Sequence, residues 1–188
     1  MPAGLKALME RAGDQRGLPP IDKWDPPFCG DLDMQIKRNG NWFYMGTPIS
    51  REALVKLFAS VLKREEDGKY YLVTPVEKIG LQVEDAPFLA VEMDWSEKLG
   101  SSVLTLRTNT GDVVEVGPDN PLRFEREETT HGFKPYVRVR GRLDALLSRP
   151  VIFELSDHLV EQDVDGEPYL GVCSHGQFFP AEPLSSLG

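Results

Sequence analysis

The sequence predicts an α+β protein made of two packed units. Three observations lead to this prediction. Short runs of alternating apolar residues between Gly, Pro and Asn predict strands along most of the chain. Two stretches with apolar residues at helical spacing predict helices between them. The stiff segment Asp85-Ala86-Pro87 divides the 188 residues into lengths typical of small domains, each of which would be only marginally stable alone.

The N-terminal region predicts a helix and then an extended connector. Apolar residues at helical spacing run from Ala3 to Ala12, and Gly13 ends the run. The Pro-rich stretch after it should be extended, because Pro fixes φ and removes a backbone donor. We expect this order of regions: helix and connector (residues 1–29), a first α+β unit (30–85), and a second, β-rich unit with helices near 142–162 (86–188).

The first unit reads as β-β-α-β-β. Asn39-Gly40 predicts a hairpin over residues 31–45, because a type I′ turn needs positive φ at two residues and Asn-Gly adopts it at low cost. Ser50 is placed to cap the following helix. The apolar stripe of that helix is Leu54, Leu57, Phe58, Val61 and Leu62. Two further strands are expected at 70–73 and 79–83.

Strands dominate the second unit until the hydrophobic period changes near residue 143. The expected strands lie at 88–93, 103–106, 113–116, around Phe124, and at 136–140. Leu143, Leu146 and Leu147 then predict a helical turn, and Ser148 and Pro150 predict the start of a helix that reaches Leu159. A strand over 151–155 is the alternative, and two short strands over 169–179 complete the unit.

Composition and missing motifs exclude several functions. The 21 basic and 30 acidic residues give a net charge of 21 − 30 = −9, which opposes bulk binding to nucleic acid or an anionic membrane. We expect a cytoplasmic protein, because two distant cysteines suit a reducing compartment and neither a signal peptide nor a membrane-spanning run is present. No phosphate-binding loop, dinucleotide fingerprint or nucleophile elbow occurs, and no cofactor is expected.

Two pairs of residues could carry chemistry, but each has a simpler interpretation. Asp31 and Asp33 share one face of a strand, where they could hold a metal for hydrolysis or form a solvated strand edge; we favour the edge. Cys173 and His175 are close in sequence, yet a structural metal site needs about four ligands.

A basic strip stands out against the acidic chain. Residues 134–149 hold five bases and one acid, Asp144, for a local charge of 5 − 1 = +4. Alternate positions of the predicted strand hold Lys134, Tyr136, Arg138 and Arg140. These side chains should lie on one face, where they would suit a phosphate beside a base or sugar. The alternative, which is commoner on protein surfaces, is pairing with acids of the neighbouring strand: Glu125, Glu127 and Glu128.

A second candidate segment is Thr74-Pro75-Val76-Glu77-Lys78. Lys78 follows a Pro-restricted turn between two strands, and residues on such loops often carry function. The alternative is a Glu-Lys surface pair.

Five stretches resemble the bacterial family called domain of unknown function 1285. They are residues 40–58 (GNWFYMGTPISREALVKLF), 71–78 (YLVTPVEK), 83–88 (VEDAPF), 143–151 (LDALLSRPV) and 176–180 (GQFFP). The resemblance implies a duplicated β-hairpin and helix core, with a second unit loosely similar to pleckstrin-homology folds. It also implies a nucleotide-like ligand between the units and a part in signal transduction. It implies no enzymatic activity.

We therefore expect a non-enzymatic protein that binds a small anionic, nucleotide-like ligand between its units. Trp42 or Tyr136 would stack on the ligand, and four cations would neutralise it: Arg51, Lys78, Lys134 and Arg138. Two alternatives stay open. One is a metal-assisted phosphoester hydrolase that uses Asp31 and Asp33, and the other is an interaction module that docks a protein partner.

Overall fold

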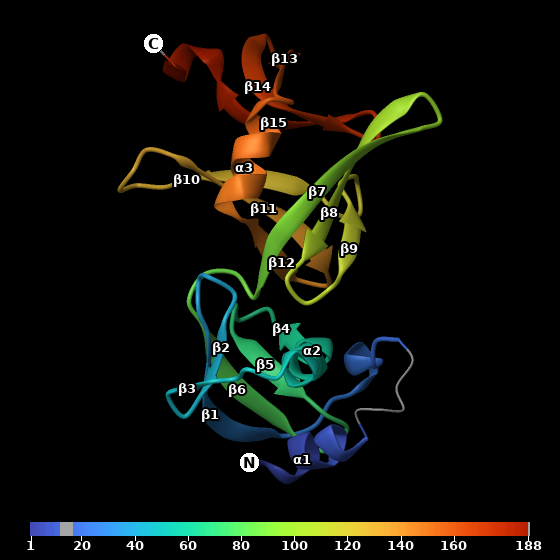
Figure 1. The fold of residues 1–188 in the computed structure, drawn as a ribbon, viewed down its shortest axis with the longest axis vertical. Coiled ribbons are helices and arrows are strands. Elements are labelled where there is room, and N and C mark those ends of the chain that lie inside the picture. The colour runs from blue at the N-terminus through green and yellow to red at the C-terminus, as the bar shows by residue number, and fades with distance from the viewer. Residues whose placement is uncertain (12–16, 188) are drawn as a thin grey trace. The chain divides into compact units, whose positions relative to one another are not determined.

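The computed structural model describes residues 1–11 and 17–187 and divides the chain into two compact units (Figure 1). The first unit comprises Met1–Pro87 with Gly141–Leu143, and the second comprises Phe88–Arg140 with the chain from Asp144 onward. The N-terminal helix α1 (Ala3–Glu10) is confirmed, whereas its expected end at Ala12 and Gly13 lies outside the described residues. A short 3-10 helix, η1 (Ile21–Lys23), follows in the connector.

The first unit is built on a six-stranded sheet in the order β3-β2-β1-β6-β5-β4. Its strands are β1 (Phe28–Ile36), β2 (Trp42–Tyr44), β3 (Thr47–Pro48), β4 (Leu62–Arg64), β5 (Tyr70–Val73) and β6 (Lys78–Val83). Two antiparallel meanders, β1-β2-β3 and β4-β5-β6, join through the parallel pairing of β1 with β6. The very short β3 and β4 were not predicted.

The hairpin of β1 and β2 is confirmed, but its turn differs from the prediction. Gly40 has a positive φ of 84°, whereas Asn39 does not. The Gly40 N–H donates to the Lys37 carbonyl over 2.9 Å, so the tight turn begins at Lys37 and Gly40 supplies the left-handed residue after it. This is the pattern of a three-residue hairpin loop with a glycine bulge rather than of a type I′ turn.

Helix α2 (Glu52–Ser60) begins and ends differently from the sequence prediction. Arg51, not Ser50, is the N-cap residue, and no side chain caps the helix. Val61 is the C-cap, and Leu62 already belongs to β4. The helix nevertheless packs as predicted, because Phe58 is fully buried and its ring stacks on Trp42 of the sheet.

The second unit has a six-stranded sheet in the order β10-β11-β12-β7-β8-β9. Its strands are β7 (Phe88–Lys98), β8 (Ser101–Thr108), β9 (Val113–Glu115), β10 (Leu122–Arg126), β11 (Phe133–Arg140) and β12 (Leu143–Leu147). The helical turn predicted at 143–147 is wrong. All five residues of β12 are buried between β11 and a parallel β7, and the apolar spacing of so short a run does not distinguish a buried strand from a helix.

The two sheets have the same topology. Read from its other edge, the second sheet runs β9-β8-β7-β12-β11-β10, so each sheet joins two meanders through its first and last strands in parallel. The helices are placed differently along the chain. Helix α2 lies between the two meanders of the first sheet, whereas α3 (Arg149–Ser156) follows the second meander of the second sheet. The likeness to pleckstrin-homology folds stays a prediction.

The second unit ends in a helix and a small sheet. Helix α3 (Arg149–Ser156) has Ser148 as N-cap and Pro150 in its first turn, so the helix prediction is confirmed over the strand alternative, although it stops before Leu159. A three-stranded sheet and a 3-10 helix follow: β13 (Val160–Val164), β14 (Glu167–Ser174), β15 (Gln177–Pro183) and η2 (Leu184–Leu187). In the described part of the chain, no helix has the length and apolarity needed to cross a membrane.

Candidate functional site

Strand β11 presents the predicted basic strip on one face. Pro135, Val137 and Val139 are buried on the opposite face, as strand alternation requires. In the register of β10 with β11, Arg123 lies opposite Tyr136 and Glu125 lies opposite Lys134. We call the surface formed by these two strands and β12 the arginine face. It consists of Arg123, Glu125, Lys134, Tyr136, Arg138, Arg140 and Asp144.

Asp144 of β12 lies at the centre of the arginine face. Its carboxylate accepts hydrogen bonds from the Arg123 Nη1, at 2.7 Å, and from the Arg138 Nε. The Asp144 side chain is 8% exposed, and a carboxylate so buried is costly unless it is paired. The Arg123 and Arg138 side chains are 45% and 37% exposed, so both guanidinium groups still reach solvent.

Tyr136 supports the cations instead of offering an open ring. The Arg123 guanidinium lies 4.4 Å from the centre of the Tyr136 ring, and the Lys134 Nζ lies 5.9 Å from it. Both distances allow a cation–π interaction. Because Tyr136 is only 5% exposed, stacking a ligand on it would require Arg123 to move first.

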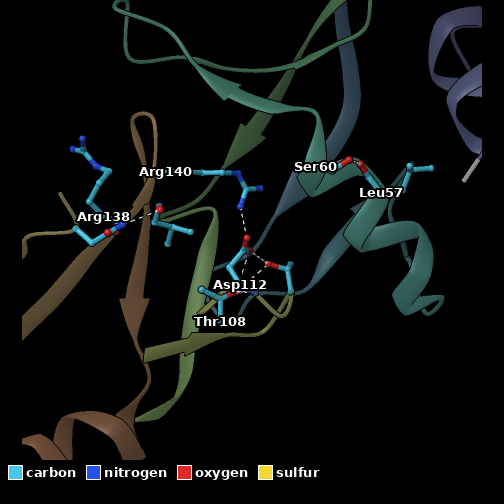
Figure 2. Close-up of polar contacts among 9 residues, drawn as sticks. Leu57, Ser60, Thr108, Asp112, Arg138 and Arg140 are labelled. Atoms are coloured by element: carbon cyan, nitrogen blue, oxygen red, sulfur yellow. Dashed lines mark hydrogen bonds and ion pairs between the residues drawn. The ribbon is translucent and has the colours of Figure 1, made fainter. Parts of the chain in front are cut away.

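Arg140 is held apart from this cluster by its own carboxylate. Figure 2 shows its guanidinium directed at Asp112, which also accepts a hydrogen bond from Thr108. With this pair included, the face has four cations and three carboxylates, and 4 − 3 leaves +1. Acids therefore do pair with the strip, as the alternative interpretation held. Of the acids expected there, Glu125 pairs with Arg123, but Arg138 and Arg140 use Asp144 and Asp112.

The other predicted ligand-binding residues lie in the first unit. Trp42 is 1% exposed and its ring stacks on Phe58 at 6.3 Å, so it is a core side chain and presents no face to a ligand. Arg51 lies exposed at the start of α2. Lys78 begins β6, pairs with Glu65 at 3.1 Å and lies 4.9 Å from the Tyr71 ring centre. Of the six predicted residues, the structure brings together Lys134, Tyr136 and Arg138.

The segment Thr74–Lys78 holds the N-terminal helix in place. The buried Glu77 carboxylate accepts the Leu5 N–H at 2.8 Å, which satisfies a backbone donor in the first turn of α1. Thr74 Oγ1 in turn accepts the Glu77 N–H at 3.2 Å. Gly4 leaves room for this contact, since a Cβ there would lie 2.6 Å from Thr74 Oγ1. Glu77 is thus a docking residue rather than half of a surface pair with Lys78.

Tyr71 is expected to ionise only in strong alkali. Its hydroxyl donates to Asp67 at 2.7 Å, and this hydrogen bond, together with burial, raises the pKa of Tyr71 to about 12. The folded-state pKa is above the ordinary value of about 10, so the stabilisation is complete below pH 10 and is lost as the pH rises toward 12. In a spectroscopic titration of tyrosinate, Asp67→Asn should lower this pKa, and Tyr71→Phe should remove the late step. Tyr70→Phe is the control, and a late step that survives in Tyr71→Phe would refute the assignment.

The residues weighed for metal binding or nucleophilic chemistry do not converge. Asp31 and Asp33 are both exposed on β1. His175 contacts Glu115 at 2.9 Å, whereas the Cys173 thiol lies 3.7 Å from the Gln162 side-chain oxygen. Among the residues that the structure describes, no three His, Cys, Asp or Glu side chains are grouped to hold a metal ion.

The comparisons with known proteins agree with this fold. The structure is a two-domain α+β protein in which each domain is built on a six-stranded sheet, and the family models likewise match two domains that meet at residues 86 and 87. The chain belongs to the DUF1285 family. The family's N-terminal "domain of unknown function" matches residues 19–86, and its C-terminal domain, described as a "protein of unknown function", matches residues 87–181.

Two solved structures of this family are similar to the chain. A DUF1285 family protein from Silicibacter pomeroyi DSS-3 is 44% identical, with a TM-score of 0.85 over 96% of this chain and 97% of that one. One from Shewanella baltica OS155 is 28% identical, with a TM-score of 0.53 over 67% of this chain and 91% of that one. The search of curated proteins gave no significant match.

The sequence reasoning missed two members of the arginine face, Arg123 and Asp144. Asp144 carried a signal, because it is the one acid in the basic stretch 134–149. Nothing in the sequence pointed to Arg123, because only the pairing register of β10 with β11 shows that it lies opposite Tyr136.

Proposed function

We propose that this protein is a non-enzymatic sensor in bacterial signal transduction that binds a small anionic, nucleotide-like ligand at the arginine face. One observation carries the proposal: Arg123 and Arg138 converge on the single buried carboxylate of Asp144. With Lys134 and Glu125 added, this cluster has three cations and two carboxylates. A phosphate that arrives from solvent therefore meets a positive site in an otherwise acidic chain.

The pairing with Asp144 prepares the two arginines for an anion. A guanidinium group has five N–H donors in a planar fork, so a bond to one carboxylate oxygen leaves the group able to contact a second anion. Because the side chains are already held by Asp144, less conformational entropy is lost when a ligand binds. Tyr136 adds to this by holding Arg123 against its ring.

Arg138→Ala is expected to weaken binding of a nucleoside diphosphate roughly 10- to 100-fold, the loss of one charge-assisted hydrogen bond. The free energy of unfolding should fall by at most about 1 kcal/mol, because Arg138 is partly exposed and Asp144 keeps Arg123. Calorimetric titration with nucleoside mono- and diphosphates, and with the uncharged nucleosides, measures the first effect. Chemical denaturation measures the second. The loss in affinity should shrink as salt rises.

Two further variants make the test specific. Arg107→Ala removes a more exposed arginine of the same unit, which is paired with Glu92, and should leave binding unchanged. Asp144→Asn removes the competing negative charge but keeps a side-chain oxygen that can still hold a guanidinium group, so it should tighten binding of the same nucleotide. If no phosphate-bearing compound binds the native protein, or if Arg107→Ala weakens binding as much as Arg138→Ala, the proposed function is wrong.

A further inference from the structure

An apolar pocket of about 250 Å³ lies in the second unit, on the opposite side of β10 and β11 from the arginine face. Phe124 and Pro135 line it, and each alternates along its strand with a residue of that face. Phe133 of β11 also lines the pocket. The remaining walls come from α3, β14, β15 and η2 and include Ile152, Leu155, Leu170 and Leu187.

Among the residues that the structure describes, one charged group lines the pocket. Glu182 is 9% exposed in its side chain and forms an ion pair with Arg126. Arg126 follows Phe124 by two residues on β10, so it projects from the same side of the strand. Arg126 is not itself a lining residue, but its guanidinium is paired with the lining carboxylate of Glu182, and its side chain is 53% exposed to solvent.

A β-bulge aims two consecutive residues of β15 at this pocket. Gly171 of β14 pairs with Pro180, while the preceding Leu170 pairs with Glu182, so Ala181 is an extra residue on β15. Both Ala181 and Glu182 therefore line the pocket, which a regular strand would not allow. Bulges are frequent next to binding sites, where they redirect a side chain.

We infer that this pocket binds a small amphiphilic monocarboxylate, with its aliphatic chain among the apolar side chains and its carboxylate on Arg126. Protein interiors rarely keep apolar voids larger than a water molecule, and an apolar cavity of about 150 Å³ already takes up benzene. The exposure of Glu182 and Arg126 indicates the charge of the ligand's head group. Glu182 is covered, so a cationic head group could reach it only by displacing Arg126, whereas an anion meets the exposed side of the Arg126 guanidinium.

Three probes that share one chain test this inference: octanoate, octanol and octylamine. We expect octanoate to bind the full-length protein at least about 10-fold more tightly than octanol, and octylamine to bind more weakly than either. Calorimetric titration below the critical micelle concentration gives the affinities. The double variant Arg126→Gln/Glu182→Gln keeps the pocket neutral and should make octanoate bind no better than octanol. Arg126→Lys should retain part of the preference.

Occupation of the pocket itself is tested by filling it. Ala181→Phe should abolish binding of all three probes, whereas Gln177→Phe, an exposed position of the same strand outside the pocket, should not. If Ala181→Phe does not fold, chemical-shift changes on octanoate titration of the native protein still locate the site. Octanoate binding that persists in folded Ala181→Phe, or shifts confined to other elements, overturns the inference. So does octanol or octylamine binding as tightly as octanoate.

Discussion

Trp42→Ala is expected to lower the free energy of unfolding of the first unit by about 3–5 kcal/mol, the usual cost of deleting a buried aromatic side chain. Trp42 is 1% exposed, and its indole lies nearly parallel to the Phe58 ring, with 25° between the planes. Its removal therefore leaves a cavity between the sheet and α2. Urea denaturation should show a lower midpoint with an unchanged slope.

Two comparisons separate the loss of packing from other causes. Trp42→Phe should cost much less than Trp42→Ala, because it keeps a ring against Phe58 and removes an indole N–H that is buried without a hydrogen-bond partner. Phe153→Ala deletes an aromatic that is 77% exposed and should change stability by no more than about 0.5 kcal/mol. If Trp42→Ala is as stable as the native protein but loses ligand binding, Trp42 is a ligand platform after all.

The sequence predicted local pairing better than long-range pairing. The hairpin of β1 with β2 was predicted because alternating strands flank a short turn. The parallel pairs of β1 with β6 and β7 with β12 were not, since parallel strands are joined through long connections that leave no local signal. Strand β13 was missed for another reason. Four of its five residues are exposed, so it lacks the alternation that identifies a half-buried strand.

The candidate site was predictable only along one strand. Alternation placed Lys134, Tyr136 and Arg138 on one face, because this period is a local property of any strand. The charges that balance them come from β10 and β12, and only the strand order shows that these strands flank β11. Asp144 shows the difficulty most clearly. It lies in a run that reads as apolar and helical, yet the strand conformation there directs its carboxylate to two arginines.

Gly171→Ala is expected to destabilise the small sheet of the second unit by about 3 kcal/mol, the upper end of the cost of overpacking. A Cβ at Gly171 would lie 2.6 Å from the Phe178 ring and closer still to the backbone carbonyl oxygen of Phe179. The ring can rotate away, but the carbonyl belongs to the paired strand β15, so β14 and β15 must separate. Denaturation and amide hydrogen exchange in β14 and β15 would measure the effect.

Gly166→Ala is the matched control for Gly171→Ala, because it distinguishes a steric clash from backbone strain in the same sheet. Gly166 has a φ of +88°, and no atom lies within 4 Å of the place that a Cβ would occupy, so alanine there should cost only the strain of a left-handed residue, about 1–2 kcal/mol. Gly171 has no such φ, and its whole cost is steric. Phe178→Ala in the Gly171→Ala background should therefore restore only part of the stability, since the Phe179 carbonyl remains. If Phe178→Ala restored the stability in full, the clash would come from the ring alone. A Gly171→Ala variant that is no less stable than Gly166→Ala would contradict the pairing of β14 with β15.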